Sequence, residues 1–194
     1  MLNVAVKLYD EEFEIIEGEK IMSPSPRFNH NLIAMRLGAV INFYFISKKM
    51  GGYVVSEMDV HFPDGNLCKP DLIAISFENR NIVDSKGKIY GVPDMAVEIF
   101  SRSTRKRDIT IKKDIYERNG VKEYWTIDPW AKIVEVFKLC DGKFDGGTEY
   151  VYYEDEEELN ELTEEELHNA KQDIDSTIFE GLNVKLSDVF GWYI

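Results

Sequence analysis

The sequence has little of two features that define whole classes of protein. It has only two cysteines, Cys68 and Cys140, too few for a disulfide framework or a zinc site built from four cysteines. It also lacks a long apolar run, because its longest apolar segment, Leu32 to Ile46, is broken by Arg36 and Gly38. We therefore expect neither a signal peptide nor a membrane span, and the cytoplasm is the expected location.

Basic residues are also fewer than acidic ones, and the excess of acidic residues is concentrated in one segment. The 194 residues include 36 Asp and Glu against 23 Lys and Arg, which gives a net charge of −13. Residues 149–180 hold 13 acidic side chains and one base, so the rest of the chain is nearly neutral. Residues 102–113, in contrast, hold six bases and one acid. An acidic protein ordinarily repels nucleic acid, but here a basic patch stands on a nearly neutral body.

The remaining composition is that of a folded domain. Hydrophobic residues make up 44% and aromatic residues 12% of the chain, which is enough to fill a core and argues against a disordered protein. At this length we expect one domain over residues 1–194, with an acidic, helical insert at residues 155–173.

The order of the predicted elements indicates a mixed α/β domain. An N-terminal hairpin is predicted from Phe13 to Ser23, with Phe13 and Ile15 carrying its apolar alternation. Helical spacing predicts helices from Asn29 to Met50 and from Asp108 to Asn119. Strands are predicted at Tyr53–Phe62, Lys69–Ser76, Asp94–Phe100, Glu123–Ile127 and Lys132–Leu139. We expect a central mixed β-sheet flanked by helices.

Two carboxylates occupy costly positions in this arrangement. Asp71 follows Pro70 at the start of a buried strand, and Glu98 lies inside a later strand. If these strands are neighbours, both acids reach one edge of the sheet and can hold Mg²⁺, with phosphate oxygens completing its ligands. Lys112, one turn into the second helix, is expected to lean towards the same edge. Two carboxylates, a metal and a lysine suffice for metal-assisted phosphodiester hydrolysis.

These residues also have ordinary structural interpretations. A Pro-Asp dipeptide is common turn chemistry, and a Glu inside a strand can pair with a neighbouring Lys or Arg. Tyr116, four residues after Lys112 and on the same helix face, is predicted to pack against the lysine. Arg105 and Arg107 are candidates for contacts to a nucleic-acid backbone, although a solvated charged loop is the simpler interpretation.

A series of motifs in this sequence resembles one known family. The motifs are KPDLIA from Lys69, GVPDMAVEI from Gly91, SRSTRKRD from Ser101, GVKEYW from Gly120, and Asp128-Pro129. In this order they resemble the Uma family, bacterial proteins classed as restriction endonucleases within the PD-(D/E)XK nuclease superfamily. The resemblance covers most of the chain, and only the acidic insert differs. It implies a restriction-endonuclease-like core and a metal-dependent nuclease that acts on DNA with Mg²⁺, or alternatively Mn²⁺.

The resemblance also assigns roles to individual residues. It matches Asp71 and Glu98 to the metal-binding acids and implies the main-chain carbonyl of Ile99 as a further metal ligand. It matches Lys112 to the catalytic lysine. The usual superfamily pattern has this lysine two residues after the second acid, where this sequence has Phe100.

Other assignments leave alternatives open. Lys113 is a rival to Lys112 as the catalytic lysine. Glu19 matches a recurrent family position and could be an outer-shell acid. His30 could contact phosphate or carry a proton, or could simply hydrogen-bond to the hairpin. The alternative function is a catalytically weak or inactive nuclease-fold module that binds nucleic acid or a protein partner. A homodimer would suit the cutting of both DNA strands, which needs two sites.

Overall fold

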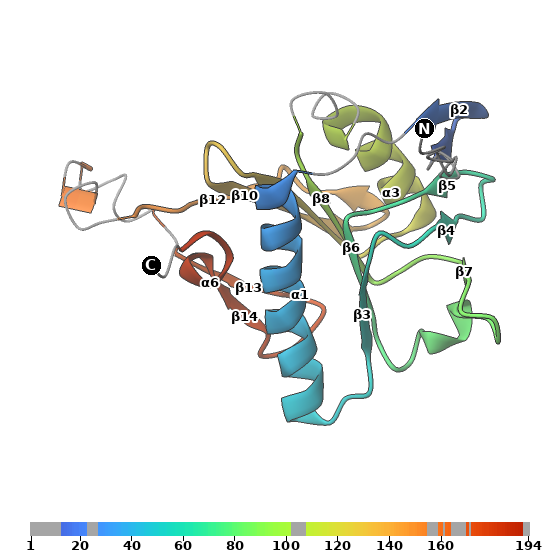
Figure 1. The fold of residues 1–194 in the computed structure, drawn as a ribbon, viewed down its shortest axis with the longest axis horizontal. Helices are drawn as coiled ribbons and strands as arrows, with labels where there is room; N and C mark the ends of the chain where they lie inside the picture. The colour runs from blue at the N-terminus through green and yellow to red at the C-terminus, as the bar shows by residue number, and fades with distance from the viewer. Residues whose placement is uncertain are drawn as a thin grey trace, which may run out of the picture.

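The structure is a computed structural model that describes residues 13–22, 27–101, 108–154, 159–160, 162–163, 170 and 172–191. Its described helical elements are α1 (Phe28–Lys48), the 3₁₀ turn η1 (Arg80–Ile82), the π-helical turn η2 (Asp108–Lys112), α3 (Lys113–Asn119) and α6 (Leu186–Phe190). The strands are β1 (Phe13–Ile16), β2 (Glu19–Met22), β3 (Tyr53–Ser56), β4 (Val60–His61), β5 (Leu67–Cys68), β6 (Leu72–Ile75), β7 (Ile89–Tyr90), β8 (Met95–Ile99), β9 (Glu123–Asp128), β10 (Ile133–Cys140), β11 (Lys143–Phe144), β12 (Thr148–Val151), β13 (Asp173–Asp175) and β14 (Asn183–Lys185) (Figure 1). The mixed α/β fold class is confirmed.

A seven-stranded sheet forms the centre of the fold. Its order is β11-β10-β9-β8-β6-β3, and β12 also pairs with β10. Strands β8 and β9 run parallel, whereas β6 pairs antiparallel with both β3 and β8. A parallel pair needs a crossover connection, and η2 and α3 lie within the crossover between β8 and β9.

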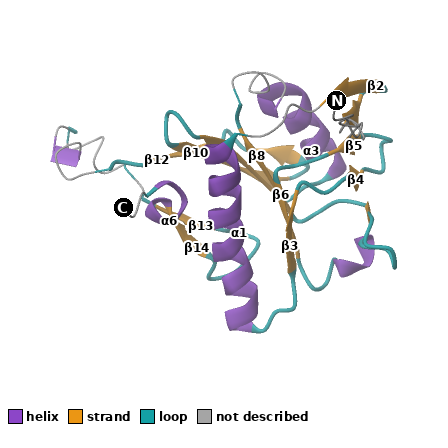
Figure 2. Ribbon diagram, viewed as in Figure 1, coloured by secondary structure: helices purple, strands orange, loops and turns teal. Residues whose placement is uncertain are grey.

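The two faces of this sheet have separate hydrophobic cores. One face is covered by α1 and by the C-terminal β13, β14 and α6, and buries Leu72 and Val97 (Figure 1). The other is covered by α3 and by a five-stranded sheet of order β2-β1-β5-β4-β7, and buries Ile73 and Ala96 (Figure 2). Because side chains alternate along a strand, Glu98 lies on the same face as Ala96, towards α3.

Helix α1 is close to its prediction, which began one residue later and ended two residues later. It ends where Lys49 adopts a left-handed conformation, with φ 55°. Its buried residues Leu37 and Ile41 belong to the core on the α1 face of the central sheet, and Tyr44 packs on Phe179 and donates to the Glu180 carbonyl. No helix in the described part of the chain is long and apolar enough to cross a membrane.

One strand prediction was wrong. The segment from Tyr53 to Phe62 is not a single strand but forms β3 and β4, which belong to different sheets. Glu57, between them, has a φ of 52°, a conformation that an extended strand does not contain. The predicted acidic insert, residues 155–173, lies largely outside the described residues.

Candidate active site

Asp71 and Glu98, the two predicted metal-binding acids, are brought together by neighbouring strands. Strands β6 and β8 pair with Leu72 opposite Val97, and the same register brings Asp71, just before β6, opposite Glu98. Asp71 Oδ2 accepts a hydrogen bond from the Ile99 N–H at 2.5 Å. Both acids therefore lie at the same end of the sheet.

Glu98 belongs to a buried cluster of charged side chains. The Lys112 ammonium lies 2.8 Å from Glu98 Oε1 and 2.8 Å from Glu14 Oε1. All three side chains are almost completely buried. A buried charge is tolerated when it is paired and hydrogen-bonded, and here one cation is shared between two carboxylates. Since water has little access, the ammonium is held in place by this pairing.

The π-helical turn η2 positions Lys112 in the charged cluster. This turn ends at Lys112, and α3 begins at the next residue. Wide π-turns are frequent at functional sites because they redirect side chains out of the regular helical order. Lys113, the sequence rival, instead lies with its ammonium 3.6 Å from the centre of the Phe137 ring. Lys112 is therefore the lysine that reaches Glu98, while Phe100 is buried in the core.

Tyr116 contacts the same carboxylate oxygen as the lysine does. Its hydroxyl donates to Glu98 Oε1 at 2.5 Å, one helical turn after Lys112. Complete burial, and then the charge of Glu98, raise the pKa of Tyr116 well above its usual value. The phenol therefore stays protonated and acts as a fixed donor to Glu98.

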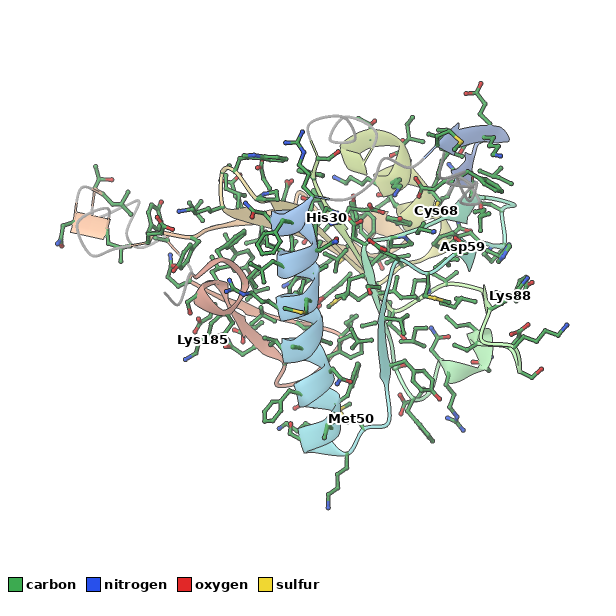
Figure 3. The ribbon with its side chains drawn as sticks, in the orientation of Figure 1. His30, Met50, Asp59, Cys68, Lys88 and Lys185 are labelled. Atoms are coloured by element: carbon green, nitrogen blue, oxygen red, sulfur yellow. The ribbon has the colours of Figure 1, made fainter. Side chains whose placement is uncertain are left out.

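His30 contacts the other acid, from the beginning of α1. Its Nε2 atom lies 3.1 Å from Asp71 Oδ1, and its Nδ1 atom lies 3.3 Å from Asn31 Oδ1. Figure 3 shows His30 at one end of α1, opposite the end that carries Met50. Burial alone would lower the pKa of His30, but the hydrogen bond to Asp71 and its negative charge raise the pKa overall. The raised pKa favours the protonated form of the ring, and the contact with Asp71 Oδ1 orients that carboxylate.

Glu14 is a site residue that the sequence reasoning missed. It lies on β1, and its Oε1 atom accepts hydrogen bonds at 2.8 Å from both the Lys112 ammonium and the Lys69 N–H. The hairpin was predicted with Phe13 and Ile15 carrying the apolar pattern, but Glu14 and Ile16 are the buried residues. The Lys112 ammonium pairs with the inward-facing Glu14 carboxylate and so offsets the cost of burying its charge. A glutamate between apolar residues in a strand, as at Glu98, was the available signal.

The other predicted site residues have different positions. Glu19 is exposed on β2, opposite Ile16 of β1. Arg105 and Arg107 lie outside the described residues, so their predicted contacts with a nucleic-acid backbone are not addressed by the structure. The site as described therefore consists of the two acids, the lysine, and the groups that hold them.

The oxygen atoms at this end of the sheet suit a hard cation. The N–H and C=O of a residue in a strand point to the same edge, so the Ile99 carbonyl faces the same side as its bond to Asp71. Two carboxylates and a carbonyl are donors of the kind that Mg²⁺ prefers, with water completing its ligands. Among the described residues, no three His, Cys, Asp or Glu side chains form a metal cluster by themselves. Water and substrate would therefore have to supply the remaining ligands.

Comparison with known families identifies the group to which this chain belongs. Residues 6–175 match the profile of the Uma2 family, described as "Putative restriction endonuclease". The chain belongs to the Uma2 family. The matched residues include every member of the site built above, from Glu14 to Tyr116. The resemblance predicted from the sequence motifs is thus confirmed.

A solved structure supports the fold of this Uma2 chain. It is a crystal structure from Anabaena variabilis ATCC 29413, described as a putative nuclease belonging to DUF820. The two share 19% sequence identity and superpose with a TM-score of 0.72, over 96% of this chain and 93% of the other. At this identity the likeness establishes the fold. A comparison with curated proteins found no match.

Proposed function

We propose that this Uma2 protein is a metal-dependent nuclease that hydrolyses phosphodiester bonds in DNA. The observation that carries the proposal is the meeting of Asp71, Glu98 and Lys112 at one end of the central sheet. This is the group of two acids and one lysine that metal-assisted phosphoryl chemistry needs. Family membership supports the same class of reaction.

Asp71, Glu98 and the Ile99 carbonyl would hold Mg²⁺, or alternatively Mn²⁺. When bound, the ion supplies positive charge that polarises the phosphoryl group and lowers the pKa of a nearby water. Asp71 is kept in position for this by His30 on one oxygen and by the Ile99 N–H on the other. Glu98 is kept in position by the Tyr116 hydroxyl.

Lys112 supplies a second positive charge next to the reacting phosphate. Negative charge builds up on the phosphoryl oxygens during attack, and a fixed ammonium in a dry site stabilises it more strongly than water does. Glu14 and Glu98 pair with the ammonium and limit its motion. We therefore assign Lys112 an electrostatic role and Glu14 a positioning role.

The test is metal titration followed by DNA cleavage. We expect isothermal titration to show binding of Mg²⁺ and Mn²⁺ to the wild type, and we expect the wild type to nick supercoiled plasmid. Asp71→Ala is expected to remove both properties, because it deletes one of the two carboxylate ligands. Asp59→Ala is the matched control, since it removes a carboxylate that is 53% exposed and lies 3.7 Å from the Lys69 ammonium.

Each outcome decides between the proposals. Loss of both properties in Asp71→Ala, with both retained in Asp59→Ala, supports the nuclease. Cleavage by Asp71→Ala that equals the wild type would contradict it. A folded wild type that neither binds metal nor cuts DNA would instead support a nuclease-fold module that binds nucleic acid or a protein partner.

A further inference from the structure

Helix α1 is apolar on two opposite faces. One face is buried in the core on the central sheet through Leu37 and Ile41, and Tyr44 packs on Phe179 of the C-terminal segment. On the other side lie four exposed apolar side chains, and at 3.6 residues per turn they form a single stripe along the helix. They are Phe28, Met35, Phe43 and Ile46, with exposed fractions of 74%, 65%, 71% and 66%. We call them the outer stripe of α1.

The outer stripe is not what the solvent face of a helix normally carries. Charged side chains usually occupy this face, whereas single exposed apolar residues are common and need no explanation. Here four large apolar residues follow one another, with exposed Ala39 and Asn42 between them and no charged side chain in the stripe. Arg36, a charged residue of α1, turns instead to the C-terminal segment and donates to the Gly191 carbonyl at 2.6 Å.

The stripe continues past the end of the helix. Met50 and Phe77 are also exposed, and the Phe77 ring lies against Gly51. Figure 3 shows Met50 at the end of α1 opposite His30. Because Phe28 is the first residue of the helix, exposed apolar side chains occur from one end of α1 to the other. With aromatic side chains presenting about 150–250 Å² each when fully exposed, these six residues offer roughly 700 Å².

An apolar area of this size is typical of a stable protein–protein interface. The largest apolar patch on a typical monomer is about 300–600 Å², and each partner in a standard protein interface buries about 800 Å². None of the six side chains is charged, and the Arg80 guanidinium over the Phe77 ring places a cation only at the margin of the surface, so nucleic acid is a poor occupant. Two copies of this acidic chain can also approach each other at this surface without electrostatic repulsion between acidic side chains.

We propose that the outer stripe of α1 is the interface of a homodimer of this chain. A two-fold interface uses the same patch on both subunits, so a self-complementary apolar stripe is what it requires. Two such helices pack at about 8–10 Å by interlocking their side-chain ridges. The proposal goes beyond the nuclease function and does not depend on it.

The test measures mass in solution as a function of concentration. Light scattering after size exclusion, from about 1 to 100 µM, should give the wild type twice the 22.5 kDa of one chain. Phe43→Glu should raise the dimer dissociation constant about 100-fold or more, because a two-fold interface meets the buried charge twice. Tyr90→Glu is the matched control: it adds the same charge at an exposed aromatic residue on β7 and should remain dimeric.

Two outcomes would overturn the proposal. One is a wild type that stays monomeric throughout the concentration range, which would mean that the stripe is covered by a different partner or by this chain itself. The other is a dimer that persists in Phe43→Glu as strongly as in Tyr90→Glu. If circular dichroism shows Phe43→Glu to be unfolded, Met35→Lys tests the same stripe at another exposed position. DNA cleavage is not part of the readout, so an inactive protein leaves the test intact.

Discussion

Two buried glutamates lie on neighbouring strands of the central sheet and have opposite surroundings. Glu98 on β8 receives its hydrogen bonds from the Lys112 ammonium and the Tyr116 hydroxyl. Glu123 on β9 receives its hydrogen bonds from neutral groups of two segments: the Trp125 indole, the Ser176 hydroxyl, and the Thr177 N–H and hydroxyl. Both side chains are nearly inaccessible to water.

The difference shows that burial alone does not identify a candidate catalytic acid. Glu123 joins the C-terminal segment to the sheet through several fixed donors, which is a structural role. Glu98 is paired with the ammonium of Lys112, and the strand register brings it opposite a second carboxylate, Asp71, at the end of the sheet. The chemistry of the partners, and the presence of a second acid, separate the two roles.

Two of the three Pro-Asp dipeptides of this chain, those that contain Asp71 and Asp94, show the same contrast. Asp94 follows Pro93 as Asp71 follows Pro70. Asp94 accepts from the Ser76 N–H at 2.8 Å and from the Lys122 ammonium at 2.6 Å, and so fixes one end of β6. Asp71 lies at the other end of β6, where the site is. The same dipeptide therefore serves structure at one end of the strand and the site at the other.

The largest expected effect comes from exchanging each glutamate for glutamine. Glu98→Gln is expected to slow plasmid nicking about 1000-fold or more, since it removes a charge that the proposed metal site needs. Its free energy of unfolding should change by less than about 1 kcal/mol, because Lys112 keeps Glu14 as a partner. Glu123→Gln should do the reverse, with unchanged cleavage and a loss of about 2 kcal/mol, because its new NH₂ group faces donors.

Cleavage assays and urea denaturation of both variants check this comparison. Equal losses of activity in the two variants would contradict the separation of roles. So would a strongly destabilised Glu98→Gln combined with a stable Glu123→Gln.

The second-largest expected effect comes from removing Lys112, the cation that distinguishes the surroundings of Glu98 from those of Glu123. Lys112→Met leaves Glu14 and Glu98 buried together without compensation and should lower the free energy of unfolding by about 3–5 kcal/mol. Lys113→Met removes only the contact with the Phe137 ring and should cost about 1 kcal/mol or less. Adding Glu14→Gln to Lys112→Met should restore part of the loss. Equal stability of the two lysine variants would contradict the buried ion pairing of Lys112 with Glu14 and Glu98.

The smallest expected effect concerns an exposed acid, Asp64, whose contribution to stability we compare with those of the buried glutamates. Partial burial would raise the pKa of Asp64, but hydrogen bonds from Asn119, Asn66 and Arg118 outweigh it and lower the pKa from 3.8 to about 2. The stabilisation by Asp64 is therefore complete above about pH 4 and is lost as the pH falls towards 2. Because solvent screens this site, Asp64→Asn should cost about 0.5 kcal/mol at pH 7.

Unfolding curves of both proteins between pH 7 and pH 2 measure this difference. The gap between wild type and Asp64→Asn should narrow as the pH falls from about 4 to 2. A gap that stays constant over this range would show that Asp64 does not titrate with a lowered pKa.

The sequence by itself determined the elements and the chemistry that they carry. Apolar spacing located α1 and the main strands, and the motifs around Asp71 and Glu98 pointed to the correct family. These features are local, because side-chain periodicity and turn residues act over a few positions along the chain. Asp71 and Glu98 were identifiable as unusual because each stands where an apolar residue was expected.

Only the tertiary structure decided which residues meet. The sequence left Lys112 and Lys113 as rivals, and the π-helical turn directs Lys112 to Glu98 and Lys113 to Phe137. It also could not connect Glu14 with Lys112, which is 98 positions away, because that contact depends on how the hairpin packs on α3. Contacts between distant segments are set by the register of strands and the packing of layers, and neither is encoded in a local pattern.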